Sequence, residues 1–156
     1  MKVSVVVVGK GKGALAEAAL DYEERARHYW KLSVTEVAQG GGGAHAPADR
    51  VRAAEAERIL ARLPAELEVV ALTRVGDAMG SRELASYLAE LGTRSAPGVC
   101  FVVGGAYGLD DRVLRRARRR WSLSELTLPH EMARLVLAEQ LYRAGTIVRG
   151  EPYHKG

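Results

Sequence analysis

The chain has 156 residues, of which 47% are hydrophobic and 27% charged, and these proportions suit one globular domain with a sizeable core. No apolar run approaches the roughly 20 residues of a membrane span, and only one positive charge, Lys2, precedes the short run at 3–8, so neither a membrane helix nor a signal peptide is expected. The net charge of +4 is weak support for an anionic partner, and the single cysteine excludes an intrachain disulfide, which makes a cytoplasmic location the default expectation.

Strands and helices are predicted to alternate along the chain. The β-branched run at its start is typical of a strand buried on both faces. In chain order the sequence predicts a strand over 3–8, a helix over 14–28, a strand over 32–37, a loop over 40–47, a helix over 50–63, a strand over 67–72, a helix over 81–91, a strand over 99–103, a helix over 111–120, an extended stretch over 123–128 and a last helix over 129–144. This alternation implies one α/β domain over residues 1–156, with a mostly parallel sheet flanked by helices.

Capping residues mark several of the expected helix ends. Asp49 is expected to cap the helix that follows it, and Asp110 or Asp111 to cap the arginine-rich helix. Pro129 fits the first turn of the last helix, where its missing N–H costs nothing, and Gly145 suits the end of that helix.

The first glycine cluster, at 9–13, lies between a strand and a helix, which is the context of a dinucleotide-binding turn. The spacing does not match that fingerprint, because Ala14 stands where the third glycine is needed for close packing of helix on strand. The favoured interpretation is a flexible turn with two solvated lysines, Lys10 and Lys12, and a phosphate contact by these lysines stays open.

The second glycine cluster, at 104–108, follows a buried strand. Ligands of open parallel sheets bind beyond the carboxyl ends of the strands, and glycine there lets the backbone approach a ligand closely. By itself this cluster is equally typical of an ordinary tight turn. A metal site is not expected, because the histidines and Cys100 lack ligand-like spacing, and Cys100 is expected to be a buried, unreactive thiol.

Arginines are dense between positions 112 and 120. On the expected helix, the arginines at 112, 116, 119 and 120 would share one face, with Asp110 and Asp111 at the helix start. A row of guanidinium groups suits phosphates, so this face is a candidate for contact with RNA or another polyanion.

The last helix and the tail after it offer two further candidates. The apolar arc of the helix is wider than one buried face requires, so the helix is either deeply buried or shared with a second subunit, and Arg134, Glu139 and Arg143 interrupt it. Tyr153 and His154 lie beyond the helix, where a frayed tail is the ordinary expectation and a functional tail is the alternative.

The final third of the chain holds four specific motifs. They are Gly104-Gly105-x-x-Gly108-Leu109, the run Trp121-Ser122-Leu123-Ser124-x-Leu126-Thr127-Leu128-Pro129-His130, the segment Leu141-Tyr142-Arg143-Ala144, and Pro152-Tyr153-His154. With the chain length and the opening strand and its Val-Gly turn, these motifs resemble the ribosomal large subunit methyltransferase H family, which are small bacterial SPOUT-class enzymes. Many relatives have Pro-Glu where this chain has Ala106-Tyr107, so these two positions need not share the family's role.

The resemblance implies an enzyme that transfers methyl from S-adenosylmethionine to N3 of a pseudouridine in helix 69 of 23S rRNA, on the assembled ribosome. It implies a homodimer, no metal, and a trefoil knot in the C-terminal part of the sheet, which is a rare exception to normal chain topology. By position, the implied cofactor contacts are Leu72, Gly104, Gly105, Leu123, Ser124, Glu125, Leu126, Thr127 and Leu128.

The chemistry of the implied reaction suggests roles for the other candidates. An imide nitrogen must lose its proton, so catalysis needs positioning and a base or an anion stabiliser. We expect His154 to remove or relay the proton, Tyr153 to help it, and Arg143 to stabilise the anion or hold a phosphate. The expected rRNA contacts are Lys10, Lys12, Arg112, Arg115, Arg116 and Arg119. Two alternatives stay open: an RNA-binding module without catalysis, and a nucleotide-dependent oxidoreductase that uses the first glycine turn.

Overall fold

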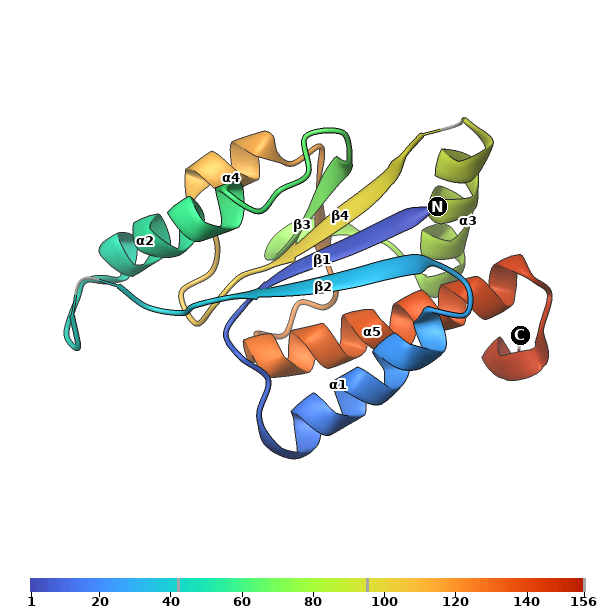
Figure 1. Cartoon of the computed structure of the whole chain (residues 1–156), viewed down its shortest axis with the longest axis horizontal. Coiled ribbons are helices and arrows are strands. Elements are labelled where there is room, and N and C mark those ends of the chain that lie inside the picture. The colour runs from blue at the N-terminus through green and yellow to red at the C-terminus, as the bar shows by residue number, and fades with distance from the viewer. Residues whose placement is uncertain (42, 95, 156) are drawn as a thin grey trace.

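A computed structural model describes residues 1–41, 43–94 and 96–155. Its centre is a five-stranded sheet in the order β2-β1-β4-β3-β5, and every neighbouring pair of strands is parallel (Figure 1). The elements are β1 (Lys2–Val8), α1 (Gly13–Ala26), β2 (Lys31–Val37), α2 (Ala48–Leu60), β3 (Glu68–Ala78), α3 (Ser81–Thr93), β4 (Gly98–Val103), α4 (Asp111–Arg116), β5 (Arg119–Ser122), α5 (His130–Val148) and a final 3-10 turn, η1 (Pro152–His154). The predicted α/β class and parallel sheet are confirmed, and the trefoil knot stays a prediction.

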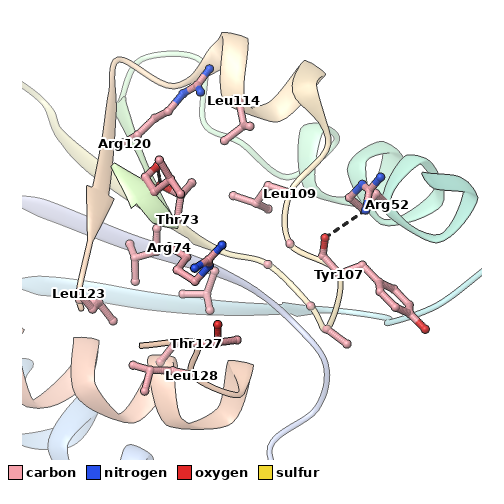
Figure 2. Close-up of a pocket in the computed structure, with 18 of the residues that line it drawn as sticks. Arg52, Thr73, Arg74, Tyr107, Leu109, Leu114, Arg120, Leu123, Thr127 and Leu128 are labelled. Carbon is pink, nitrogen blue, oxygen red and sulfur yellow. Dashed lines mark hydrogen bonds between the residues drawn. The ribbon is translucent and has the colours of Figure 1, made fainter. Parts of the chain in front are cut away.

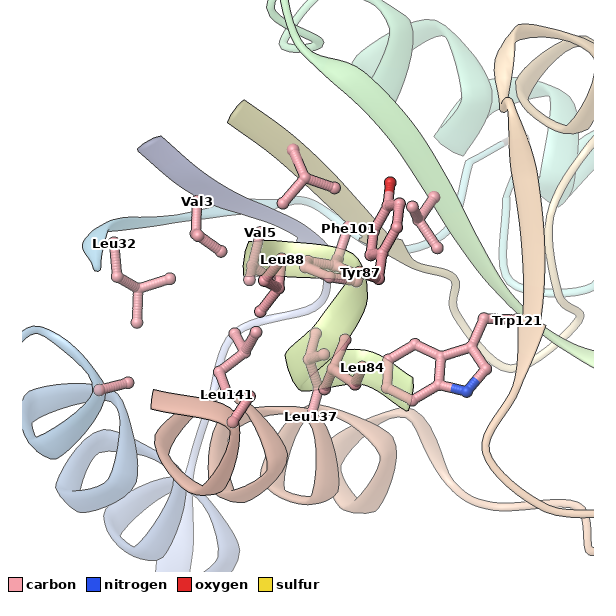
Figure 3. Close-up of a cluster of buried hydrophobic side chains, with 14 of the residues drawn as sticks. Val3, Val5, Leu32, Leu84, Tyr87, Leu88, Phe101, Trp121, Leu137 and Leu141 are labelled. Atoms are coloured by element: carbon pink, nitrogen blue, oxygen red, sulfur yellow. The ribbon is translucent and has the colours of Figure 1, made fainter. Parts of the chain in front are cut away.

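Helices cover both faces of the sheet and bury two apolar clusters. On one face, α1, α3 and α5 pack together, and Leu137 and Leu141 of α5 face Leu84 and Leu88 of α3 and Phe101 of the sheet (Figure 3). On the other face, α2 and α4 cover a smaller cluster. This two-faced burial explains the continuous apolar sequences of β1 and β4, since strands of such sheets have no solvated side.

The central strand β4 is buried along its whole length. Cys100 lies in it and has no exposed surface, and burial raises the pKa of its thiol to about 12. The expected burial of this thiol is therefore confirmed, and burial disfavours the thiolate, which is the reactive form of a cysteine.

The arginine-rich segment departs from the prediction. The helix ends at Arg116, Ala117 is extended, and 119–122 forms the edge strand β5 beside β3. Burial of Trp121 against Phe101, with ring centroids 6.0 Å apart, explains the change, because a helix could not place this indole in the core. The predicted row of arginines on one helix face over 112–120 is therefore wrong.

Several predicted helix ends also shift. Asp49 lies in the first turn of α2 rather than at its N-cap, which is Pro47, whereas Asp110 caps α4 as predicted by accepting a hydrogen bond from the Arg112 N–H at 2.8 Å. Gly145 does not end α5, which continues to Val148. Within the described ranges, no helix has the length and hydropathy needed to cross a membrane.

Candidate functional site

A pocket of about 600 Å³ lies beyond the carboxyl end of β4 and beside the irregular part of β3, where the β3–β4 pairing has ended (Figure 2). This is the edge at which open parallel sheets bind ligands. Its walls come from residues 72–75 of β3, the turn after β4, and the segment between β5 and α5. The lining residues are Arg52, Leu72, Thr73, Arg74, Val75, Val103, Gly104, Gly105, Ala106, Tyr107, Gly108, Leu109, Asp111, Leu114, Arg120, Leu123, Ser124, Leu126, Thr127, Leu128 and Ala133.

The residues predicted from sequence to bind a cofactor meet at this pocket. Leu72, Gly104 and Gly105 lie in its wall, and so does the segment over 123–128 with the exception of Glu125, which does not line it. Segments about fifty residues apart along the chain are thus brought to one cavity by the strand order, since β3 and β4 are neighbours and β5 joins β3 at the edge.

The glycine turn after β4 has no room for side chains on its inner side. A Cβ on Gly104 would lie 2.9 Å from the Leu109 side chain, and a Cβ on Gly105 would lie 3.0 Å from Glu55 Oε1 and Val8 Cγ1. The Gly108 N–H closes the turn by donating to the Gly105 carbonyl at 3.1 Å. Glycine is therefore needed at these two positions for the turn to pack on its neighbours at the edge of the pocket.

Two serines fix the shape of the segment over 123–128. The Ser122 hydroxyl lies 2.9 Å from the Ser124 carbonyl and 3.0 Å from the Arg74 carbonyl, and the Leu126 N–H donates to Ser124 Oγ at 2.9 Å. These bonds bend the chain over the pocket and tie it to the end of β3. The Ser-Leu-Ser spacing therefore has a structural cause, whatever the segment binds.

The pocket also contains residues that the sequence reasoning missed. Thr73, Arg74 and Val75 lie where the register of β3 against β5 shifts between Leu72 and Asp77, so this part of the strand leaves the ladder and borders the cavity. The strand-end rule that led to 104–108 applied equally to these residues after Leu72. No sequence signal indicated Arg52, which reaches the pocket from α2.

The first glycine turn is filled by the protein's own side chains. The ring of His130 occupies the space beside Gly9, where a Cβ would lie 2.9 Å from its Nε2, and the cavity at this turn measures only about 10 Å³. A dinucleotide has no space there, so the oxidoreductase alternative loses its site. Lys10 and Lys12 are exposed on this turn, as expected.

Arg134, which interrupts the apolar arc of α5, points inward and is 7% exposed. Its guanidinium donates to both oxygens of Glu23 and to Glu36 Oε2. Glu36 also accepts the Gly11 N–H at 3.0 Å, and this bond and then Arg134 hold the pKa of Glu36 below its usual value. The network fixes the first glycine turn to the start of α5.

The arginines expected to contact RNA differ in whether their guanidinium groups are held by other side chains. Arg112 lies against Glu57 at 2.7 Å and Asp110 at 3.3 Å, and its hydrogen bonds with these carboxylates raise its pKa. Arg119 lies over the Tyr87 ring, 4.4 Å from its centroid. Arg115 and Arg116 are exposed on α4. The predicted set thus divides between a short helix and a strand.

The C-terminal tail follows the end of α5 and folds back against this helix, whereas the segment over 123–128 precedes the start of α5 (Figure 1). Tyr153 donates to Glu139 Oε2 at 2.9 Å, and burial together with its hydrogen bonds raises the pKa of its phenol. Arg143 also holds Glu139, at 2.6 Å, and lies over the Tyr153 ring. His154 is half-buried, and its Nδ1 has no partner among the described residues. The tail is therefore packed, but not against the pocket of its own chain.

The chain matches the family model described as "Predicted SPOUT methyltransferase" over residues 1–154. It is 54% identical over 156 residues to a protein of Gemmatimonas aurantiaca named ribosomal RNA large subunit methyltransferase H, covering 99% of this chain and 100% of that one. A protein of Syntrophotalea carbinolica with the same name is 44% identical and covers 99% of both chains. Among solved structures, a Legionella pneumophila protein described as a methyltransferase in complex with SAM aligns over 92% of this chain and 66% of its own, with a TM-score of 0.50 and 13% identity, which supports the fold.

Proposed function

Because the chain belongs to the SPOUT methyltransferase family, we propose that it uses S-adenosylmethionine to methylate N3 of a pseudouridine in helix 69 of 23S rRNA, on the assembled ribosome. The names of its relatives support large-subunit rRNA as the substrate. One structural observation carries the proposal: the glycine turn at 104–108 and the segment over 123–128 enclose one pocket at the carboxyl edge of the sheet.

The residues of this pocket fit the proposed cofactor. Apolar side chains of Leu72, Leu123 and Leu128 would provide a slot for an adenine ring, and backbone groups over 123–128 and at Gly104 would supply its hydrogen bonds. The cofactor, when bound, supplies a methyl group already activated by its sulfonium. The chain then needs only to align the acceptor nitrogen with that methyl and to manage one proton.

We propose that His154 accepts the N3 proton of the substrate, with Tyr153 and Arg143 beside it. The imidazole of His154 would accept the proton of the imide N3–H, so that N3 can take the methyl group that the cofactor would supply. Arg143 would stabilise the anionic ring of the substrate. Arg143 also lies over the Tyr153 ring and so contacts the tail.

The position of the tail favours a second subunit for this assignment. The tail packs on the second half of α5, where Tyr153 bonds to Glu139, whereas the pocket meets this helix at Ala133, so about 9 Å of helix axis lies between the two contacts. We therefore infer a homodimer in which His154 of the partner subunit reaches the pocket. Half-buried apolar residues of α5, such as Leu135 and Val136, suit a shared helix face.

Mixed dimers test this arrangement. We expect a chain carrying His154→Ala and a chain carrying Gly104→Val to be inactive as homodimers but to regain activity when combined, since one composite site of the mixed dimer keeps both intact parts. Two different pocket variants, combined in the same way, serve as the control. Activity of His154→Ala homodimers at the wild-type rate would remove His154 from the mechanism.

The rRNA would lie across the basic groups around this edge, namely Lys10, Lys12, Arg112, Arg115, Arg116 and Arg119. Among these, Arg112 is held by carboxylates and we expect it to contribute least. Such a substrate and the lack of a disulfide are consistent with a cytoplasmic enzyme.

The direct test offers methyl-labelled cofactor with intact ribosomes, isolated large subunits and free 23S rRNA. We expect label only in intact ribosomes, at a single pseudouridine of helix 69, with methylation at N3 identified by nucleoside mass spectrometry. Label at another base would overturn the assigned target. Calorimetric titration with S-adenosylmethionine separates this enzyme from a non-catalytic RNA-binding module, because the module would not bind the cofactor and would give no heat of binding.

A further inference from the structure

Charged as well as apolar side chains line the pocket. Three arginines border it: Arg52 from α2, Arg74 from the irregular part of β3, and Arg120 from β5 (Figure 2). The only acidic residue among the lining residues that the structure describes is Asp111. Positions far apart in the sequence therefore bring positive charge to the wall of one concave site.

Two of these arginines have their hydrogen-bonding capacity free. Arg74 and Arg120 are exposed, and neither guanidinium makes a hydrogen bond or ion pair with another residue within 1–41, 43–94 and 96–155. In contrast, Arg134 and Arg143 are both held by carboxylates. One N–H of the Arg52 guanidinium donates to the Tyr107 carbonyl, at 3.3 Å. A guanidinium presents five donors in a planar fork, so these three side chains hold many donors ready for an anion.

The charge of the possible ligands decides which anion this is. S-adenosylmethionine carries a sulfonium, an ammonium and one carboxylate, so its net charge is positive and three arginines beside it are unfavourable as its main contacts. An rRNA strand carries one negative charge at every phosphate, and arginine binds phosphate oxygens in bidentate fashion. The three arginines of the pocket wall are therefore complementary to the nucleic acid rather than to the cofactor as a whole.

We infer that Arg52, Arg74 and Arg120 form a phosphate-binding rim, which holds the rRNA backbone next to the nucleotide that enters the pocket. This inference rests on the proposed function, because it takes the substrate to be RNA. It differs from the contacts expected from sequence, which lie on the outer surface, since the rim belongs to the wall of the pocket itself. The three arginines are positioning residues that orient the substrate.

The experiment compares a double variant, R74Q/R120Q, with the wild type and with R62Q/R82Q, which removes two exposed arginines outside the pocket. Binding to ribosomes is measured by co-sedimentation over a range of salt concentrations, and cofactor binding by calorimetry. The logarithm of the ribosome-binding constant falls with the logarithm of salt concentration, and each lost phosphate contact makes this slope less steep by about 0.9. We therefore expect the slope of R74Q/R120Q to be less steep than that of the wild type by about 2. Cofactor affinity should stay within twofold of the wild type.

Conservative replacement adds a second readout. R74K/R120K keeps both charges, so its salt slope should return to near the wild-type value, and R52Q should lower the slope by less than R74Q/R120Q. An unchanged slope in R74Q/R120Q, or a slope loss equal to that of R62Q/R82Q, would overturn the inference. So would a loss of cofactor affinity with unchanged ribosome binding, because the arginines would then hold the cofactor carboxylate. The binding readout does not need methyl transfer, so failure of the proposed reaction would show separately, as absent label with wild-type protein.

Discussion

The guanidinium of Arg134 donates to both oxygens of Glu23, at 2.9 and 3.1 Å, and this ion pair is buried between α1 and α5. Removing one partner leaves the other as an uncompensated buried charge, which costs about 3–5 kcal/mol. We predict that Arg134→Met lowers the free energy of unfolding by about this amount, as measured by urea denaturation. Adding Glu23→Leu to Arg134→Met should recover part of the loss, and a double variant less stable than Arg134→Met would contradict this account.

Glu36 adds a pH dependence to the same network. Its folded pKa lies below the usual value of 4.5, chiefly because of the Gly11 N–H, so its carboxylate stabilises the fold at higher pH. That contribution is complete above the unfolded pKa and is lost as pH falls below 4.5 through the folded pKa. We predict that the stability gap between wild type and Glu36→Gln is constant above about pH 6 and shrinks below about pH 4.

Thermal denaturation of both proteins between pH 3 and pH 7 measures this gap. Glu17→Gln is the matched control, since Glu17 is exposed on α1 and makes no hydrogen bond or ion pair within the described ranges. A gap between wild type and Glu36→Gln that widens on acidification would have the wrong sign for a lowered pKa.

Gly145 and Gly92 provide a matched pair of helix glycines. A Cβ on Gly145 would lie 2.4 Å from Tyr29 Cγ, whereas a Cβ on Gly92 would meet nothing within 4 Å. We predict that Gly145→Ala lowers the free energy of unfolding by about 1–3 kcal/mol through overpacking, and that Gly92→Ala raises it by up to about 1 kcal/mol. Chemical denaturation of the two variants checks this, and equal effects would show that the Tyr29 contact does not limit Gly145.

These glycines show why part of the fold was not predictable from the sequence. Gly145 looked like a helix end, because the sequence cannot show that Tyr29 packs on α5 and needs a bare backbone there. The segment over 119–122 has helical spacing of its arginines, and only its pairing with β3 and the burial of Trp121 make it a strand. In both cases a contact between residues far apart in the sequence overrides the local sequence pattern.

The candidate cofactor pocket was more accessible to sequence reasoning than its surroundings. A glycine turn after a buried strand obeys the strand-end rule, and the Ser-Leu-Ser run carries a specific family motif, so both were placed at a site before the fold was known. The rim arginines were missed because Arg52, Arg74 and Arg120 come from three elements whose proximity depends on the sheet order. The sequence also does not show that Tyr153 contacts Glu139 and Arg143 on α5 rather than the pocket of its own chain.

Gly104 offers a test that separates binding from folding. A Cβ there would lie 2.9 Å from Leu109 Cδ2 and 3.1 Å from the Gly108 carbonyl carbon, so the turn over 104–108 must shift to accept it. Because this turn forms a wall of the pocket, we predict that Gly104→Ala weakens S-adenosylmethionine binding by about tenfold, which corresponds to about 1.4 kcal/mol. The thermal stability should fall less than in Gly145→Ala, since the turn lies at the surface and α5 in the core. Calorimetric titration measures the affinity, with Gly92→Ala as the control that leaves the pocket intact. Unchanged affinity in a folded Gly104→Ala protein would mean that the cofactor does not rest on this turn.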